Sequence, residues 1–176
     1  MDSATHLAQL VDALSGDVVR RHHAAERRQL PDLVDKLAAL AAAAADEPGR
    51  FVTALGALIK LRDLLQAHLE KEEHILFPAF AALGDAARRG LERPPLPFPS
   101  VVHPIRVMET DHRRLDAAVA DLRTHAAQVV VPPALRAGWM EWRRALDGFA
   151  DELAAHLALE DEVLFPRALE LERALD

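Results

Sequence analysis

Histidine is the residue type with the greatest chemical potential in this chain. The 176 residues include nine histidines and no cysteine. Without cysteine the chain has no disulfide, no protein-held iron–sulfur cluster, no thiolate zinc site and no thiol nucleophile. It also lacks tyrosine, which excludes phenolate ligation. Because imidazole is the commonest metal ligand in proteins, so many histidines in an acidic chain indicate a metal site.

Two copies of one motif place histidine and glutamate four residues apart. The first copy, over residues 68–78, reads HLEKEEHILFP, and the second, over residues 156–166, reads HLALEDEVLFP. A spacing of four puts both side chains on one helix face. A lone histidine lies upstream of each copy, at His23 and His112. Each half of the chain thus carries the same set, and two halves related by a pseudo-two-fold axis would converge on one centre.

Helical periodicity separates four inward histidines from five others. The residues seven positions away are Leu61 and Ile75 for His68, and Phe149 and Val163 for His156. Apolar residues also flank His112, and they favour His23 over its neighbour His22. We therefore expect His23, His68, His112 and His156 to point inward, and His6, His22, His74, His103 and His125 to lie outside or at the boundary.

Glu72 and Glu160 share the inward face with the histidines four residues before them. Buried carboxylates are rare unless they are paired or bind metal. No cationic residue lies on these stripes within the helices, so the pattern favours a metal centre over a metal-free bundle. The predicted ligands are His23, His68, Glu72, His112, His156 and Glu160.

The number and type of these donors favour two iron ions. One zinc would use about four ligands and leave two groups unused. Calcium or magnesium would demand more oxygen ligands. Mixed imidazole and carboxylate suits iron first and manganese second. With two histidines on each iron, both carboxylates bridging and a bridging oxo or hydroxo, each iron would keep about one exchangeable position.

The elements that must position these ligands are helices. The alanine-rich, glycine-poor composition and the apolar periodicity predict an all-α, up-down-up-down four-helix bundle. We expect one domain over 1–176, with repeat halves of about 1–89 and 104–176 and a proline-rich connector over 90–104. The predicted helices cover about 3–45, 50–77 with a tail to 89, 104–128 and 134–165. Pro31 is expected to bend or interrupt the first, and Pro78 and Pro166 to kink the second and fourth.

Charge and hydropathy exclude several partners. The net charge of −7 argues against nucleic acid, which calls for a basic face. No apolar run is long enough to span a membrane. The first residues lack the basic and apolar blocks of a signal peptide, so a cytoplasmic location is expected. We also expect a monomer.

Taken together, these motifs resemble the hemerythrin-like (hemerythrin HHE cation-binding) family over essentially the whole chain. The matching pieces are His23 before RRQLP, the two His-x-x-x-Glu motifs before Leu-Phe-Pro, and Met108-Glu109-x-x-His112. The resemblance implies a non-haem di-iron centre that handles O₂, nitric oxide or peroxide. Relatives include oxygen carriers, gas and redox sensors, and iron–sulfur repair proteins.

Two departures from the family pattern shape the expected function. Relatives usually supply a fifth histidine, which in the repair branch comes shortly before the second helix; here residues 41–51 contain none. Water, Glu26 or Glu109 would then complete the iron shell, which disfavours reversible O₂ carriage. The chain also carries no Cys-bearing domain before its first helix, which disfavours iron–sulfur repair. We therefore expect peroxide- or nitric-oxide-related stress chemistry, with an unidentified electron donor.

Other interpretations remain beside this one. The protein could be a non-enzymatic O₂, nitric oxide or redox sensor or an iron-binding protein. A partner protein could then bind the proline-rich connector, although the prolines favour a rigid crossover. Ferritin-type ferroxidase chemistry wants two Glu-x-x-His pairs, and only Glu109 with His112 fits. The remaining polar and aromatic residues are expected to act as follows: Glu70, Glu73, Asp161 and Glu162 as solvated acids, Glu109 or Asp111 as optional supports for an imidazole, and Trp139 and Trp142 in packing.

Overall fold

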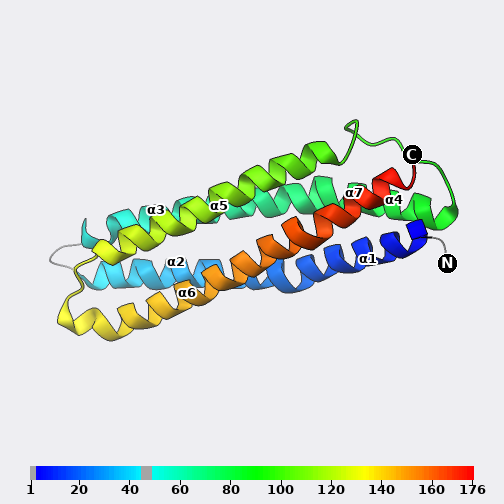
Figure 1. Cartoon of the computed structure of the whole chain (residues 1–176). Coiled ribbons are helices and arrows are strands. Elements are labelled where there is room, and N and C mark those ends of the chain that lie inside the picture. Colours follow the sequence, from blue (N-terminus) through cyan, green and yellow to red (C-terminus); the bar gives the residue numbers. More distant parts are fainter. Residues whose placement is uncertain (1–2, 45–48) are drawn as a thin grey trace.

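The computed structural model describes residues 3–44 and 49–176, which form four antiparallel helical rods (Figure 1). The first rod comprises α1 (Ser3–Asp17), the π turn η1 (Val18–His23) and α2 (Ala24–Ala43). The second comprises α3 (Gly49–Lys71), η2 (Glu72–Leu76) and α4 (Phe77–Arg89). The third is α5 (Val102–Gln128), and the fourth comprises η3 (Pro133–Leu135), α6 (Arg136–Leu159), η4 (Glu160–Leu164) and α7 (Phe165–Arg173). The described residues contain no strand, and the predicted all-α bundle is confirmed.

Three of the rods change from α to π geometry in the middle, and proline explains two of these changes. Pro78 and Pro166 are the second residues of α4 and α7, directly after η2 and η4. A proline has no N–H for the carbonyl four residues earlier, so the preceding turn can widen without losing a further hydrogen bond. Pro31 does not interrupt the first rod, because α2 runs through it as a continuous helix, and the predicted bend there stays a prediction. The first rod instead changes geometry at η1.

The π turns shift the helical phase, and this corrects the expected environment of two residues. A π turn inserts about one residue, which rotates everything after it by roughly 100°. Ile75 and Val163 were expected on the inward face, but their exposed fractions are 48% and 38%. The residues that follow them, Leu76 and Leu164, are buried instead.

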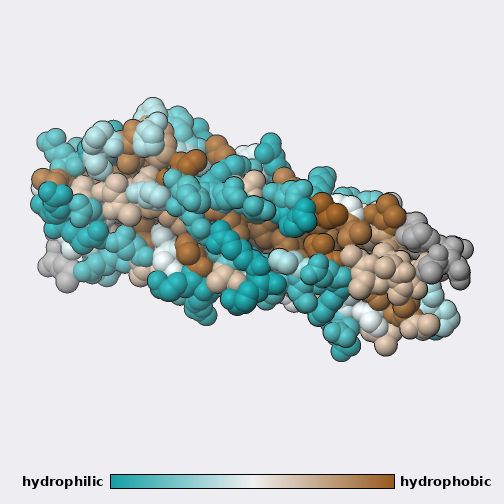
Figure 2. Space-filling view, turned by 180° about the vertical axis from the view of Figure 1, so that it is seen from behind, coloured by the Kyte–Doolittle hydropathy of each residue, from teal (hydrophilic) through white to brown (hydrophobic). Residues whose placement is uncertain are grey.

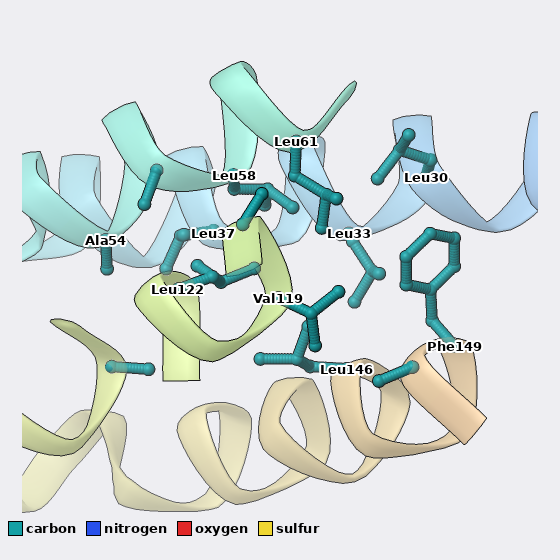
Figure 3. Packing of buried hydrophobic residues seen from close by; sticks show 14 of the residues in the cluster. Leu30, Leu33, Leu37, Ala54, Leu58, Leu61, Val119, Leu122, Leu146 and Phe149 are labelled. Carbon is teal, nitrogen blue, oxygen red and sulfur yellow. The ribbon is translucent and has the colours of Figure 1, made fainter. Parts of the chain in front are cut away.

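Two apolar clusters fill the bundle, one toward each end. In the cluster of α2, α3, α5 and α6, side chains such as Leu37, Leu58 and Leu122 interleave between the rods (Figure 3). Trp139 and Trp142 lie in this cluster, as expected, with ring centroids 4.9 Å apart. The other cluster joins α1, α4, α7 and the start of α5. The π turns contribute Val18, Leu76 and Leu164 to this second cluster.

The proline-rich connector is an ordered crossover anchored by Glu172 of α7. Gly90 ends α4 in the left-handed conformation that glycine adopts without strain. Glu172 is buried and accepts hydrogen bonds from the backbone N–H of Val101 (3.0 Å), the hydroxyl of Ser100 (2.6 Å) and the guanidinium of Arg93 (3.2 Å). The carboxylate thus holds the start of α5 against the fourth rod.

The surface is largely hydrophilic on one face (Figure 2), although hydrophobic residues make up 51% of the chain. Seen from behind Figure 1, hydrophilic residues cover most of the face, with hydrophobic patches mainly toward the right-hand side (Figure 2). No described helix is both long enough and apolar enough to cross a membrane.

Candidate metal centre

All six predicted ligands meet in the middle of the bundle, between the two apolar clusters. Each rod supplies at least one of them, and the three π turns end or begin at His23, Glu72 and Glu160. The exposed fraction is 2% for His112 and 0% for the other five. π turns occur frequently at functional sites, because the wider turn re-aims a side chain that regular helix would point elsewhere.

The six side chains form two groups that share their carboxylates. One group contains His23, His156, Glu72 and Glu160, and the other contains His68, His112, Glu72 and Glu160. Within each group, the candidate ligand atoms lie within 4.8 Å of one another. Each group joins the lone histidine of one half of the chain to the motif histidine of the other half. Such an arrangement suits two neighbouring metal positions bridged by both glutamates.

Nine buried polar atoms of these six side chains have no hydrogen-bond partner among the described residues, and eight of them are candidate ligand atoms, the ninth being Nδ1 of His68. The eight candidate ligand atoms are the Nε2 atoms of the four histidines and both carboxylate oxygens of Glu72 and Glu160. Neighbouring Nε2 and oxygen atoms approach within 3.2 Å for His23 and Glu72 and 3.3 Å for His112 and Glu160, without hydrogen-bond geometry. An unsatisfied buried polar atom costs about 1–3 kcal/mol. Metal coordination would satisfy all eight, so the residues present fit a two-metal centre.

Three carboxylates outside the two groups hold the imidazole rings. Nδ1 of His23 lies 2.7 Å from Glu73, and Nδ1 of His112 lies 2.9 Å from Asp161. An ionised carboxylate only accepts hydrogen bonds, so each Nδ1 donates and each Nε2 is left as the free acceptor. The expectation of a solvated acid is confirmed for Asp161, which is exposed, whereas Glu73 is half-buried; the role of both in holding an imidazole was not predicted. The sequence did contain a signal, because each directly follows the glutamate of a His-x-x-x-Glu motif.

Glu26 is the third of these carboxylates. It is buried, and its Oε1 lies 2.8 Å from Nδ1 of His156. It belongs to neither group of candidate ligands, nor does Glu109, which is exposed. That water or one of these glutamates completes the iron shell stays a prediction, and residues 45–48 of the stretch that would carry the fifth histidine lie outside the described residues.

Asp111 was considered as an alternative support for an imidazole, and it has other partners. It is mostly buried and forms ion pairs with Lys71 (2.5 Å) and Arg114 (3.2 Å). Glu70 and Glu162 hold no imidazole of the centre in the structure described. The supports for the rings therefore come from the residues after the motif glutamates and from α2.

The five histidines predicted to lie outside the centre belong to neither group. His6, His74 and His103 are exposed, and His125 is half-buried beside Asp121. His22 departs from the prediction, because it is half-buried and stacks on His156 with ring centroids 5.3 Å apart. The π geometry of η1 turns both adjacent histidines toward the bundle. His103, placed in the connector by its prolines, belongs to α5.

The electrostatics of the metal-free centre differ between the two motifs. Burial lowers the pKa of His68 to about 3. Burial also acts to lower the pKa of His156, but the neighbouring carboxylate of Glu160 and the hydrogen bond with Glu26 outweigh it and raise that pKa to about 10. Burial and the neighbouring charge of Glu160 raise the pKa of Glu72 well above its usual value. For Glu160, burial is outweighed by His112 and His156, which lower its pKa.

A surface pocket approaches the centre between α2 and α3. Its volume is about 390 Å³, and Leu30, Leu65 and Leu69 form its apolar walls. Glu26 also lines it, and the same carboxylate is hydrogen-bonded to His156. Arg27 lies on the pocket lining and binds Glu73 at 2.7 Å. The pocket therefore reaches one residue in direct contact with a candidate ligand, Glu26 with His156, and a second, Arg27, that binds the carboxylate holding His23.

A helical bundle with paired histidines around two shared glutamates defines a class of cation-binding domain. The family model described as the hemerythrin HHE cation-binding domain matches residues 14–168, and the chain belongs to this family. The chain is 30% identical to the iron-sulfur cluster repair protein YtfE of Escherichia coli O157:H7, over 93% of this chain and 66% of that protein. It is 31% identical to the proteins of that name in Salmonella paratyphi B and Salmonella newport, over 94% of this chain and 68% of each. The chain spans about two thirds of the length of these relatives.

Proposed function

We propose that this protein holds two iron ions with a bridging oxo or hydroxo and decomposes peroxide or nitric oxide in the cytoplasm, as a monomer served by a separate electron donor. The observation that carries the proposal is the set of eight buried, unpartnered donor atoms at one centre. Four imidazole nitrogens with two carboxylates are a donor set that suits iron. His23, His68, His112, His156, Glu72 and Glu160 would hold the two irons, which would supply reversible electron transfer to a small oxidant.

The chain's own residues prepare the centre for such a reaction. Six side chains are too few to saturate two metals with bridging carboxylates, so exchangeable positions remain for a small molecule. The apolar clusters on either side exclude bulk water and strengthen electrostatic interactions inside. Glu73, Asp161 and Glu26 fix three of the four imidazoles. The pocket beside Glu26 offers an approach for a molecule as small as peroxide.

The proposal is tested by metal analysis, an optical spectrum and turnover assays on the iron-loaded protein. We expect two irons per chain, oxo-to-iron charge-transfer absorption, and oxygen evolution from peroxide or consumption of nitric oxide. Glu72→Ala should abolish turnover, whereas the surface control Glu109→Ala should retain it. One zinc per chain, or equal turnover by Glu72→Ala and the unmodified protein, would contradict the proposal.

Iron–sulfur cluster repair is a second candidate, favoured by the names of the relatives over nearly the whole of this chain. It is tested by adding the iron-loaded protein to an iron–sulfur enzyme inactivated with peroxide or nitric oxide. Recovery that requires Glu72 supports repair, and no recovery contradicts it. A reversible change in the visible spectrum with O₂ or nitric oxide, without turnover or repair, would instead identify a sensor.

A further inference from the structure

We propose that the two metal positions are unequal, with a tight position at His23 and His156 and a labile position at His68 and His112, and that Glu26 is the positioning residue responsible. The inference rests on the two-metal centre of the proposed function. It concerns the residues that support the ligands rather than the ligands themselves, which are equal in type on the two sides.

The supporting hydrogen bonds are unevenly distributed. At the tight position both rings are held, because Nδ1 of His23 lies 2.7 Å from Glu73 and Nδ1 of His156 lies 2.8 Å from Glu26. At the labile position only His112 is held, by Asp161 at 2.9 Å. Nδ1 of His68 is buried and has no hydrogen-bond partner among the described residues.

The internal repeat explains why this support is missing. Glu73 and Asp161 occupy equivalent places in the two motifs, so they support His23 and His112 in the same way. Glu26 follows His23 by three residues, and the residue three positions after His112 is Leu115. Both are 1% exposed. One half therefore places a carboxylate where the other half places an apolar side chain.

This difference acts on metal affinity through the imidazole. A carboxylate at Nδ1 fixes the ring and its tautomer and makes Nε2 a stronger electron donor, and losing such a partner typically costs about 10–100-fold in metal affinity. Asp111, a mostly buried acid on α5, forms ion pairs with Lys71 and Arg114 and does not replace the missing carboxylate at Nδ1 of His68. His68 thus enters coordination without a fixed orientation, and its metal should dissociate first.

The test is an equilibrium competition between the protein and a chelator for cobalt(II), whose visible absorption reports occupancy. The unmodified protein should bind two cobalt ions per chain with dissociation constants about 10–100-fold apart. Failure to bind a second metal would contradict the proposed function itself. Two metals with one shared affinity would overturn only the inequality proposed here.

Variants of the supporting acids assign each affinity to a position. Glu26→Leu copies the environment of the other half and should weaken the tighter constant by about 10–100-fold, so that the two affinities converge. Glu26→Gln keeps an acceptor oxygen for Nδ1 and should recover part of the loss. Glu73→Gln should weaken the tighter constant, and Asp161→Asn the looser one.

Two controls separate positioning from folding. Glu109→Leu removes an exposed acid and should change neither constant. Circular dichroism of each metal-free variant should show the same helical content. If Glu26→Leu is folded and keeps the gap between the two affinities, Glu26 is not the positioning residue.

Discussion

In the first half of the chain, the rod with the lone histidine contains a π turn and carries Glu26 three residues after His23. In the second half, the equivalent helix α5 has no π turn and carries Leu115 three residues after His112. The motif helices of the two halves, by contrast, match closely, with π turns over Glu72–Leu76 and Glu160–Leu164. The repeat therefore preserves the candidate ligands more faithfully than the residues that support them.

The largest effect should come from removing a shared carboxylate rather than a single-position histidine. Glu72 and Glu160 each belong to both ligand groups. We expect Glu72→Ala or Glu160→Ala to bring metal content below one per chain, because both positions lose a ligand. His68→Ala should spare the position at His23 and His156 and leave about one metal per chain by elemental analysis. Two metal ions per chain in Glu72→Ala would contradict the proposal that Glu72 is a ligand at both metal positions.

The next largest effect should come from replacing the buried leucine that follows the phase shift in each half. Leu76 and Leu164 occupy equivalent places and are almost completely buried. Leu76→Ala and Leu164→Ala should each lower the free energy of unfolding of the metal-free protein by about 2–5 kcal/mol. Denaturant unfolding followed by circular dichroism measures both. A large cost in only one half would show that the two π turns are packed differently.

Removing the metal should destabilise the protein by an intermediate amount. A ligand that binds only the folded state at 100 times its dissociation constant stabilises it by about 2.7 kcal/mol. For a domain of this size, each kcal/mol shifts Tm by roughly 2–4 °C. Calorimetry before and after chelation should therefore show a fall of about 5–11 °C. His68→Ala should lose only part of this shift, and an unchanged Tm would contradict specific metal binding.

The smallest effect should come from the residues just before those leucines. Ile75 and Val163 are exposed, although periodicity without the π turn places them in the core. Ile75→Ala and Val163→Ala should change the free energy of unfolding by no more than about 0.5 kcal/mol, as is usual at the surface. The same denaturant titration serves here. A loss of more than about 2 kcal/mol in the free energy of unfolding would show that the side chain is buried, and hence that the π turn does not shift the helical phase in that half.

Reasoning from the sequence predicted most of the fold because its signals are local. Apolar spacing located the helices, and the prolines of residues 90–104 located the crossover. The same spacing identified the six inward side chains that the structure brings together. It failed at Ile75 and Val163, where a π turn changes the phase, and an interruption at Pro31 is absent because α2 continues through it.

The acids that support the imidazoles make contacts between different rods, which spacing along one helix does not predict. Glu73 and Asp161 lie on the polar side of their helices by spacing, yet each reaches a histidine on another rod. The separation between Glu26 and His156 along the chain is 130 residues, so only packing of the first rod against the fourth could reveal that contact. The position of Glu26 on the apolar face of α2, with Leu30 and Leu33, was the signal in the sequence that this acid is buried.

The sequence by itself determined the donor types, their spacing and the helices that carry them, because side-chain chemistry and helical period are properties of the chain read in order. Only the tertiary structure decided that His23 shares a group with His156 and His68 with His112. It also decided that Glu26 supports one motif histidine while the other has no such partner. These outcomes depend on how the rods pack and how each π turn rotates its side chains, and distances between rods are not encoded in the spacing along any one of them.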